Sequence, residues 1–283
     1  MQIKKVGIAG AGVMGGGIAQ MFAERGLEVM VWDVNKSQLD KGIDAIKKRL
    51  GKSVEKGGIT PARSAEISGR IQAAAGLADF KDVHLAVEAV PEDFSIKKGI
   101  FSELEKHIAD DAALATNTSS LSVGAIAAGL KTPARFLGMH FFNPPTKLEL
   151  VEVVPAATTD PAVLAGVQAF LRACGKTPVV VKDSPGFIVN RLLLLLINEA
   201  ARMVDDGVAS AADIDTAMKL GALHPAGPLA VADLIGLDTC KKILEALHAE
   251  LGESSYKPAG AISAKISAGK LGRKNGEGFF QYQ

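Results

Sequence analysis

The sequence predicts an α/β fold in which a doubly wound, mainly parallel sheet is followed by an all-helical C-terminal domain. Over residues 1–185, short apolar runs alternate with longer amphipathic stretches, which is the pattern of strands joined by helices. Over residues 186–283, nearly all of the periodicity is helical. A chain of 283 residues is long enough for two domains. We therefore place the sheet domain at 1–185 and the helical domain at 186–283.

The apolar runs and the amphipathic stretches predict the elements in chain order. Strands are expected at 5–9, 27–32, 83–89, 112–116, 136–142, 148–154 and 178–181, with helices at 13–25, 36–56, 92–107 and 161–174. In the second domain, helices are expected at 187–204, 211–220, 229–251 and 259–267, and the next strand at 278–280. The first of these C-terminal helices has apolar residues nearly all round, which predicts that it is buried between partners.

The composition excludes several classes of protein. Hydrophobic residues make up 48% and charged residues 22% of the chain, so extensive disorder is excluded. With 32 Lys and Arg against 31 Asp and Glu, the chain lacks the basic excess of a nucleic-acid-binding or membrane-surface protein. The two cysteines, Cys174 and Cys240, form no disulfide framework. The His, Cys and Asp residues show no metal-ligand spacing, so no metal is expected.

The N-terminal residues favour a cytoplasmic protein. They lead directly into the first expected strand and show no signal-peptide or transit-peptide pattern. The longest apolar run in the helix after residue 190 covers only 192–197, whereas a membrane span needs about 18–20 apolar residues. We expect neither a membrane nor a nucleic acid as a partner.

A glycine-rich loop joins the first strand to the first helix. Gly10, Gly12 and Gly15 form the pattern GxGxxG, which is weak evidence by itself but is here flanked by a strand and a helix. Gly10 would permit a tight turn, Gly12 would let a pyrophosphate approach the backbone at the helix N-terminus, and Gly15 would allow close packing of helix on strand. The context predicts a Rossmann-type dinucleotide site.

Asp33, at the end of the second strand, indicates which dinucleotide binds. Its carboxylate would accept hydrogen bonds from a ribose and repel a 2′-phosphate, which favours NAD over NADP. Val13 and Met14, the first residues of the helix, belong to the same predicted cofactor site. The loop alone is also compatible with FAD.

Two ionisable side chains lie inside apolar strands. His140 is near the end of the strand expected at 136–142, and Glu152 is inside the one expected at 148–154. A carboxylate is costly to bury without a partner, and a histidine on the neighbouring strand is the simplest partner. Such a pair would be a general base poised near neutral pH. The alternative is that His140 caps its strand and Glu152 faces solvent.

Several ordered motifs resemble the 3-hydroxyacyl-CoA dehydrogenase family over nearly the whole chain. They are the glycine loop at 10–15, Asn-Thr-Ser-Ser at 117–120, His-Phe-Phe-Asn-Pro at 140–144 and Gly-Phe-Ile-Val-Asn-Arg at 186–191. Within the family, the chain is most similar to the stand-alone bacterial 3-hydroxybutyryl-CoA dehydrogenases, which lack a fused hydratase part.

The resemblance implies NAD as cofactor, a 3-hydroxyacyl-CoA or 3-oxoacyl-CoA as substrate, the (S) isomer of the hydroxy acid, and a homodimer formed through the helical domain. It implies that His140 is the catalytic base, that Glu152 orients it, and that Ser119 and Asn190 bind the reacting end of the substrate. The positions that match NAD contacts of the family are Asp33, Glu92, Lys97, Asn117 and Asn143.

The helix expected at 36–56 is locally basic, with seven Lys or Arg and three acids. A solvated helix face is one interpretation of such a charge run. The other is that the phosphates of coenzyme A bind there, and the resemblance makes Lys52 the best single candidate for that contact.

Three further alternatives remain at this stage. The substrate could be a longer 3-hydroxyacyl-CoA or a sugar acid, or the chain could be a non-catalytic NADH-binding protein. A dehydrogenase of small 3-hydroxy acids that uses a lysine in the helix entering the second domain is disfavoured. No lysine occurs between Lys182 and Lys219, and that helix presents Asn190 instead.

Overall fold

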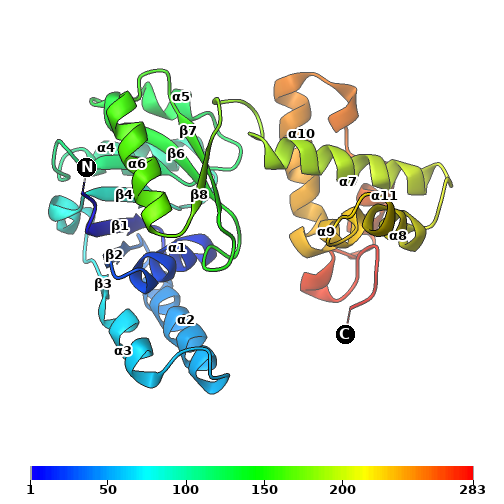
Figure 1. The fold of residues 1–283 in the computed structure, drawn as a ribbon. Coiled ribbons are helices and arrows are strands. Elements are labelled where there is room, and N and C mark those ends of the chain that lie inside the picture. Colours follow the sequence, from blue (N-terminus) through cyan, green and yellow to red (C-terminus); the bar gives the residue numbers. More distant parts are fainter. Residues whose placement is uncertain (1, 283) are drawn as a thin grey trace. The chain divides into compact units, whose positions relative to one another are not determined.

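The computed structural model describes residues 2–282, and in it the chain divides into two units, Met1–Ser184 and Pro185–Gln283. The division falls where the alternating half of the sequence gives way to the helical half. The first unit contains the sheet, and the second consists of helices with short connections (Figure 1).

An eight-stranded sheet forms the centre of the first unit, with the strand order β3-β2-β1-β4-β5-β6-β7-β8. The strands are β1 Lys5–Ala9, β2 Glu28–Trp32, β3 Ile71–Ala73, β4 Leu85–Glu88, β5 Ala113–Thr116, β6 Phe136–Phe141, β7 Leu150–Pro155 and β8 Thr177–Val180. Only β6 and β7 pair antiparallel among the strand pairs of the described chain. The prediction of a doubly wound, mainly parallel sheet is confirmed.

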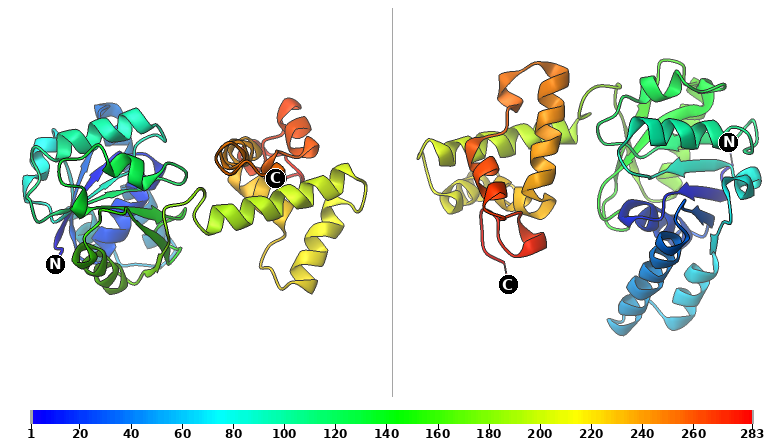
Figure 2. Two further views of the ribbon diagram at one scale, coloured as in Figure 1. Left: turned by 90° about the horizontal axis from the view of Figure 1, so that it is seen from above. Right: turned by 180° about the vertical axis from the view of Figure 1, so that it is seen from behind.

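Helices cover both faces of this sheet, and Figure 2 shows α4 and α5 on the opposite side from α6. They are α1 Val13–Glu24, α2 Lys36–Glu55, α3 Pro61–Gly69, α4 Phe94–Leu104, α5 Val123–Ala127 and α6 Pro161–Ala173, with short 3-10 turns at Leu77–Asp82 and Pro133–Arg135. Phe22 of α1 packs against Phe170 of α6, with ring centroids 5.3 Å apart. Phe101 of α4 packs edge-on against Phe136 at 4.8 Å. The helices therefore bury both faces of the sheet, which explains the uninterrupted apolar runs of β4 and β5.

The strand order reverses beside β1, since β2 lies on one side of it and β4 on the other. Ligands of open α/β sheets bind outside the carboxyl ends of the strands at such a switch point. The loops after β1, β2, β4 and β5 all start at this edge. Helices α2 and α3 lie side by side and project away from the sheet (Figures 1 and 2).

Three short elements of the first unit do not appear among the predicted ones. They are α3, β3 and α5. β3 has only three residues and α5 only five, so neither is long enough to show a periodicity.

The second unit is a cluster of helices around its own apolar core, which includes Leu194, Ile197 and Leu244. The helices are α7 Val189–Asp205, α8 Ala211–Gly221, α9 Pro228–Ile235, α10 Leu237–Leu251 and α11 Gly260–Ser267, with 3-10 turns at Ser254–Tyr256 and Arg273–Asn275.

Two expectations for the second unit are wrong. The stretch 229–251 is two helices and not one, because Gly236 has a φ of +100°, which no helix can contain. The strand expected at 278–280 is absent from the described chain, where only the isolated bridges Gly272↔Glu277 and Glu277↔Gln281 form near it. The amides of Phe279 and Phe280 instead donate to the buried carboxylate of Asp233, at 2.8 and 2.9 Å.

Both thiols are buried, and burial raises the pKa of Cys174 to about 11 and that of Cys240 to about 12. Among residues 2–282, the helices are all too short or too polar to cross a membrane. The same residues contain no group of three or more His, Cys, Asp or Glu side chains that could hold a metal ion.

Candidate active site

The glycine loop between β1 and α1 has a different requirement at each glycine. Gly10 has a φ of +110°, and a side chain there would lie 2.5 Å from the Ala89 carbonyl oxygen. A Cβ on Gly15 would lie 1.8 Å from the Gly10 carbonyl oxygen. At Gly12, by contrast, no atom of any residue other than its two chain neighbours lies within 4 Å of the Cβ position. The protein itself therefore requires Gly10 and Gly15, whereas Gly12 leaves room beside the backbone for a ligand.

Helix α1 begins directly after this open position, at Val13 and Met14. Its N-cap is Gly12, which has no side chain that could accept hydrogen bonds from the amides of the first turn. The first amides of a helix lack partners within the helix, and together with the helix dipole they attract anions. The residues present here fit the pyrophosphate of a dinucleotide.

Asp33 ties the glycine loop to the end of β2. Its Oδ2 accepts a hydrogen bond from the amide of Ala11 at 2.9 Å, and its Oδ1 accepts one from Asn35 at 2.9 Å. A cavity of about 810 Å³ lies beside it, lined among others by Trp32, Val34 and residues 73–78. This size is typical of small-molecule and cofactor sites. Sequence reasoning missed the 73–78 wall because it missed β3, which leads into it.

His140 and Glu152 face each other across the antiparallel strands β6 and β7, where they are register partners. His140 Nδ1 lies 2.8 Å from Glu152 Oε2, and the two residues are 7% and 0% exposed. The predicted pairing is confirmed, and the alternative of a solvent-facing Glu152 is wrong. A buried carboxylate fixes the proton of a neighbouring imidazole on the nitrogen that contacts it, here Nδ1.

Two asparagines lie near this pair. Asn117 follows β5, and its Oδ1 accepts a hydrogen bond from the amide of Phe141, the residue after His140, at 2.9 Å. Asn143 follows β6, is exposed, and precedes Pro144 with a cis peptide bond.

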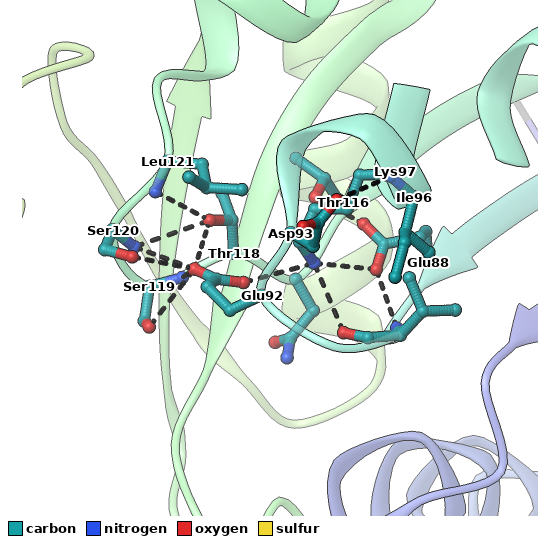
Figure 3. Close-up of polar contacts among 12 residues, drawn as sticks. Glu88, Glu92, Asp93, Ile96, Lys97, Thr116, Thr118, Ser119, Ser120 and Leu121 are labelled. Carbon is teal, nitrogen blue, oxygen red and sulfur yellow. Dashed lines mark hydrogen bonds and ion pairs between the residues drawn. The ribbon is translucent and has the colours of Figure 1, made fainter. Parts of the chain in front are cut away.

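Glu92, in the loop after β4, holds the loop that contains Ser119 (Figure 3). Its Oε1 accepts hydrogen bonds from the amides of Ser119 at 2.8 Å and Ser120 at 3.0 Å, and from the Thr118 hydroxyl at 2.5 Å. The hydroxyls of both serines also donate to it, at 3.4 and 3.1 Å. Burial acts to raise the pKa of Glu92, but Lys97 and these donors outweigh burial and lower it.

Lys97 was predicted to contact the cofactor, and in the structure its side chain has no exposed surface. Its Nζ lies 2.7 Å from Glu88 Oε1 and 3.2 Å from Glu92 Oε2. The ammonium therefore contacts two carboxylates of the protein, of which Glu92 is the partly exposed one.

Glu88 is a member of this group that sequence reasoning missed. It is the last residue of β4 and is fully buried. The signal was available, because a carboxylate within the apolar run 83–89 needs a partner just as Glu152 does.

The remaining predicted residues lie elsewhere. Asn190 is in the first turn of α7 and so belongs to the second unit. Lys52 is exposed near the end of α2 in the first unit. The first unit therefore assembles the glycine loop, Asp33, the Glu92 group and the His140–Glu152 pair at one edge of its sheet.

Comparisons with known proteins agree with this description. Residues 5–184 match the family model "3-hydroxyacyl-CoA dehydrogenase, NAD binding domain", and residues 186–282 match "3-hydroxyacyl-CoA dehydrogenase, C-terminal domain". The chain is 45% identical over 278 residues to a Deinococcus radiodurans protein named "Probable 3-hydroxybutyryl-CoA dehydrogenase", covering 98% of this chain and 100% of that one. It is 42% identical to the 3-hydroxybutyryl-CoA dehydrogenase of Clostridioides difficile, covering 98% and 99%. The crystal structure of (S)-3-hydroxybutyryl-CoA dehydrogenase from Ralstonia eutropha superposes with a TM-score of 0.94 at 40% identity, over 100% of both chains.

The geometry of the glycines predicts that Gly12→Ala and Gly15→Ala behave differently. Gly12→Ala should fold with an unchanged melting temperature but bind NADH at least about tenfold more weakly, because the methyl group occupies the space open to the ligand. Gly15→Ala should destabilise the unit by about 1–3 kcal/mol or more, because its Cβ overlaps a backbone oxygen. Thermal unfolding and NADH fluorescence titration measure the two effects. Normal NADH affinity in Gly12→Ala would contradict the assignment of the loop.

Proposed function

Because the chain belongs to the 3-hydroxyacyl-CoA dehydrogenase family and is an NAD-dependent oxidoreductase, we propose that it interconverts (S)-3-hydroxybutyryl-CoA and acetoacetyl-CoA. The observation that carries this proposal is the buried His140–Glu152 pair. It lies at the same sheet edge as the dinucleotide loop, where a substrate could meet both the cofactor and a general base.

His140 would act through Nε2, because Nδ1 is engaged by Glu152. NAD, when bound, supplies the acceptor for the hydride that leaves C3 of the hydroxy substrate. His140 Nε2 takes the proton of the C3 hydroxyl, so the substrate loses a hydride and a proton and becomes a ketone. In the reverse direction the imidazolium returns the proton to the C3 oxygen. The Glu152 carboxylate stabilises that imidazolium and holds the ring in place.

Ser119 and Asn190 would hydrogen-bond the C3 oxygen or the thioester carbonyl. Such contacts orient the substrate and stabilise the charge that develops on oxygen in the transition state. Glu92 fixes the loop that contains Ser119, because it accepts hydrogen bonds from the amides of Ser119 and Ser120. Ser119 is therefore presented by an ordered backbone.

The cofactor would lie across the carboxyl edge of the sheet. Its adenosine half would occupy the cavity beside Asp33, with the ribose against that carboxylate. Its nicotinamide half would lie on the other side of the switch point, near Glu92, Asn117 and Asn143. The absence of an arginine beside Asp33, which is followed by Val34 and Asn35, favours NAD over NADP.

The exposed cations of α2 would bind the phosphates of coenzyme A. Lys52 carries this role best, since it is exposed and has a position that matches the family. It lies in the last turn of α2, where it also interacts favourably with the helix dipole.

Two other functions are tested by the same assay. A non-catalytic NADH-binding protein would keep the glycine loop but would have no use for a buried His140–Glu152 pair. An enzyme for longer 3-hydroxyacyl-CoAs or for a sugar acid would keep the pair and differ in substrate. Oxidation of NADH with acetoacetyl-CoA, then with a chain-length series of 3-oxoacyl-CoAs, distinguishes the acyl-CoA enzymes from the other two, and reduction of NAD with sugar acids separates those two. A cytoplasmic location stays a prediction, which cell fractionation would test.

Replacing His140 with Gln should lower kcat by about 10²- to 10⁴-fold, the usual contribution of a general acid–base group. NADH binding should persist, because the glycine loop is untouched. Steady-state kinetics and NADH titration measure the two properties. His248→Gln is the matched control, since that histidine is only half-buried and lies on α10 in the second unit. Near-normal turnover in His140→Gln would rule out the proposed base.

Lys52→Ala should raise the KM for acetoacetyl-CoA about fivefold, equivalent to one partly screened charge pair of ~1 kcal/mol. The KM for NADH should not change. Added salt should raise the KM for acetoacetyl-CoA more steeply than that for NADH. Lys4→Ala is the control, because Lys4 is an exposed lysine immediately before β1. Equal salt dependence of the two KM values would argue against the site on α2.

We also propose that the protein is a homodimer formed through the helical unit, as the family resemblance implies. The second unit has large exposed apolar side chains at Leu220, Leu223 and Leu234, with 76%, 86% and 63% exposure. Analytical ultracentrifugation should give twice the chain mass of 29.4 kDa. Leu234→Glu should reduce it to the mass of one chain, and a single-chain mass for the unchanged protein would contradict the proposal.

A further inference from the structure

The proposed reaction makes no use of Glu88, yet the structure buries this carboxylate completely and gives it strong partners. Glu88, Lys97 and Glu92 form a row in which the ammonium lies between two carboxylates (Figure 3). The side chains of Glu88 and Lys97 are 0% exposed, and that of Glu92 is 34% exposed. Burying such groups is costly, and hydrophobic residues of similar size often give greater stability.

We propose that Glu88 is a positioning residue for the reaction. Through Lys97, Glu88 fixes the position of Glu92 and the net negative charge of the row. Glu92 in turn holds the loop at 118–120 that presents Ser119. This inference rests on the proposed function, in which Ser119 binds the reacting end of the substrate.

The contacts of Glu88 fix one end of the row. Its Oε1 accepts hydrogen bonds from the amide of Val90 and from Lys97 Nζ, both at 2.7 Å. Its Oε2 accepts one from the hydroxyl of Thr116 at 2.6 Å. All three partners are assigned as donors, as an ionised carboxylate requires, and they oppose the burial that raises the pKa of Glu88. Because Val90, Thr116 and Glu88 itself belong to or adjoin the central strands, the ammonium of Lys97 is held by the rigid part of the sheet.

The charge of Glu88 decides how Lys97 acts on Glu92. The row has two negative charges and one positive charge, and the ammonium is nearer to Glu88 than to Glu92. Lys97 therefore neutralises Glu92 only in part. Glu92 Oε1, the oxygen that does not contact Lys97, accepts hydrogen bonds from the amides of Ser119 and Ser120. Without the charge of Glu88, Lys97 would have Glu92 as its only carboxylate partner and would draw it from the loop.

The same net charge bears on the cofactor. Glu92 is the exposed member of the row and lies on the side of the switch point where the nicotinamide half is expected. The nicotinamide ring is positively charged in NAD and neutral in NADH. A net negative charge nearby stabilises the oxidised form relative to the reduced form. Glu88, without touching the cofactor, would then change the ratio of the Kd of NAD to the Kd of NADH.

Glu88→Gln tests the proposal, because glutamine keeps the shape and removes the charge. Its Oε1 can accept from Val90 and Lys97, and its amide group can donate to the Thr116 oxygen. We expect kcat with acetoacetyl-CoA and NADH to fall about tenfold. The ratio of the Kd of NAD to the Kd of NADH should rise about three- to tenfold, the effect of one partly screened charge. Glu88→Asp, which restores the charge, should return that ratio to within about twofold of the unchanged protein.

Glu105→Gln is the matched control. This carboxylate also accepts hydrogen bonds from two backbone amides of a loop, those of Lys131 and Thr132. Glu105 is the C-cap of α4, whereas Glu92 precedes the N-terminus of that helix. Glu105→Gln should leave both kcat and the Kd ratio unchanged.

The outcomes separate a positioning role from a structural one. A lower melting temperature with equally weaker binding of NAD and NADH would indicate a structural role and overturn the proposal. A folded Glu88→Gln variant with unchanged kcat and Kd ratio would also overturn it.

If Glu88→Gln does not fold, Thr116→Val removes one hydrogen bond to Glu88 while keeping its charge. It should lower kcat by a smaller factor at a constant Kd ratio, and an unchanged kcat would then overturn the proposal. If the unchanged protein shows no turnover with acetoacetyl-CoA, the proposed function fails, and the Kd ratio still tests Glu88.

Discussion

The cost of burying a carboxylate inside an apolar strand organises this molecule. Glu88 ends β4 and Glu152 lies within β7, and both are fully buried. Each requires a partner that can carry a positive charge, and each finds one, Lys97 for Glu88 and His140 for Glu152. An unpaired charge at either position would cost several kcal/mol, a large part of the stability of a typical domain. Neither carboxylate can therefore lose its partner alone without a large cost in stability, and both pairs are candidate parts of the site.

The sheet converts these pairs into a site because its strands are mainly parallel. Parallel strands direct their carboxyl ends to one edge, so loops far apart in sequence meet there. Asp33 after β2, Glu92 after β4 and Asn117 after β5 all lie at this edge. Asp33 binds the glycine loop, Glu92 binds the Ser119 loop, and Asn117 binds the strand of His140. Each of these three predicted ligand contacts thus also joins its own loop to another segment at the same edge of the sheet.

Lys97 matches a cofactor-contacting position of the family, yet its surroundings allow it only an indirect effect on a ligand. As a residue that matches a cofactor contact, it would be expected on the surface of the cleft, yet its side chain has no exposed surface. A fully buried ammonium between two carboxylates can affect a ligand only through their positions and through the field of the row. The exposed end of the row is Glu92, through which Lys97 would act on a bound cofactor.

The sequence by itself was sufficient for several features that depend on local backbone conformation or on the cost of burial, although sequence reasoning missed the helix break at Gly236 and the buried Glu88. The glycine loop, the alternation of strands and helices, and the need of Glu152 for a partner could all be read along the chain, because each depends on neighbouring residues. The tertiary structure alone decided which distant side chains meet. The contact of Lys97 with Glu88 and the wall of the cavity beside β3 follow from strand register and packing, which join residues that no local pattern connects. Hydrophobic periodicity carries no information on such pairs, since many registers bury the same apolar face.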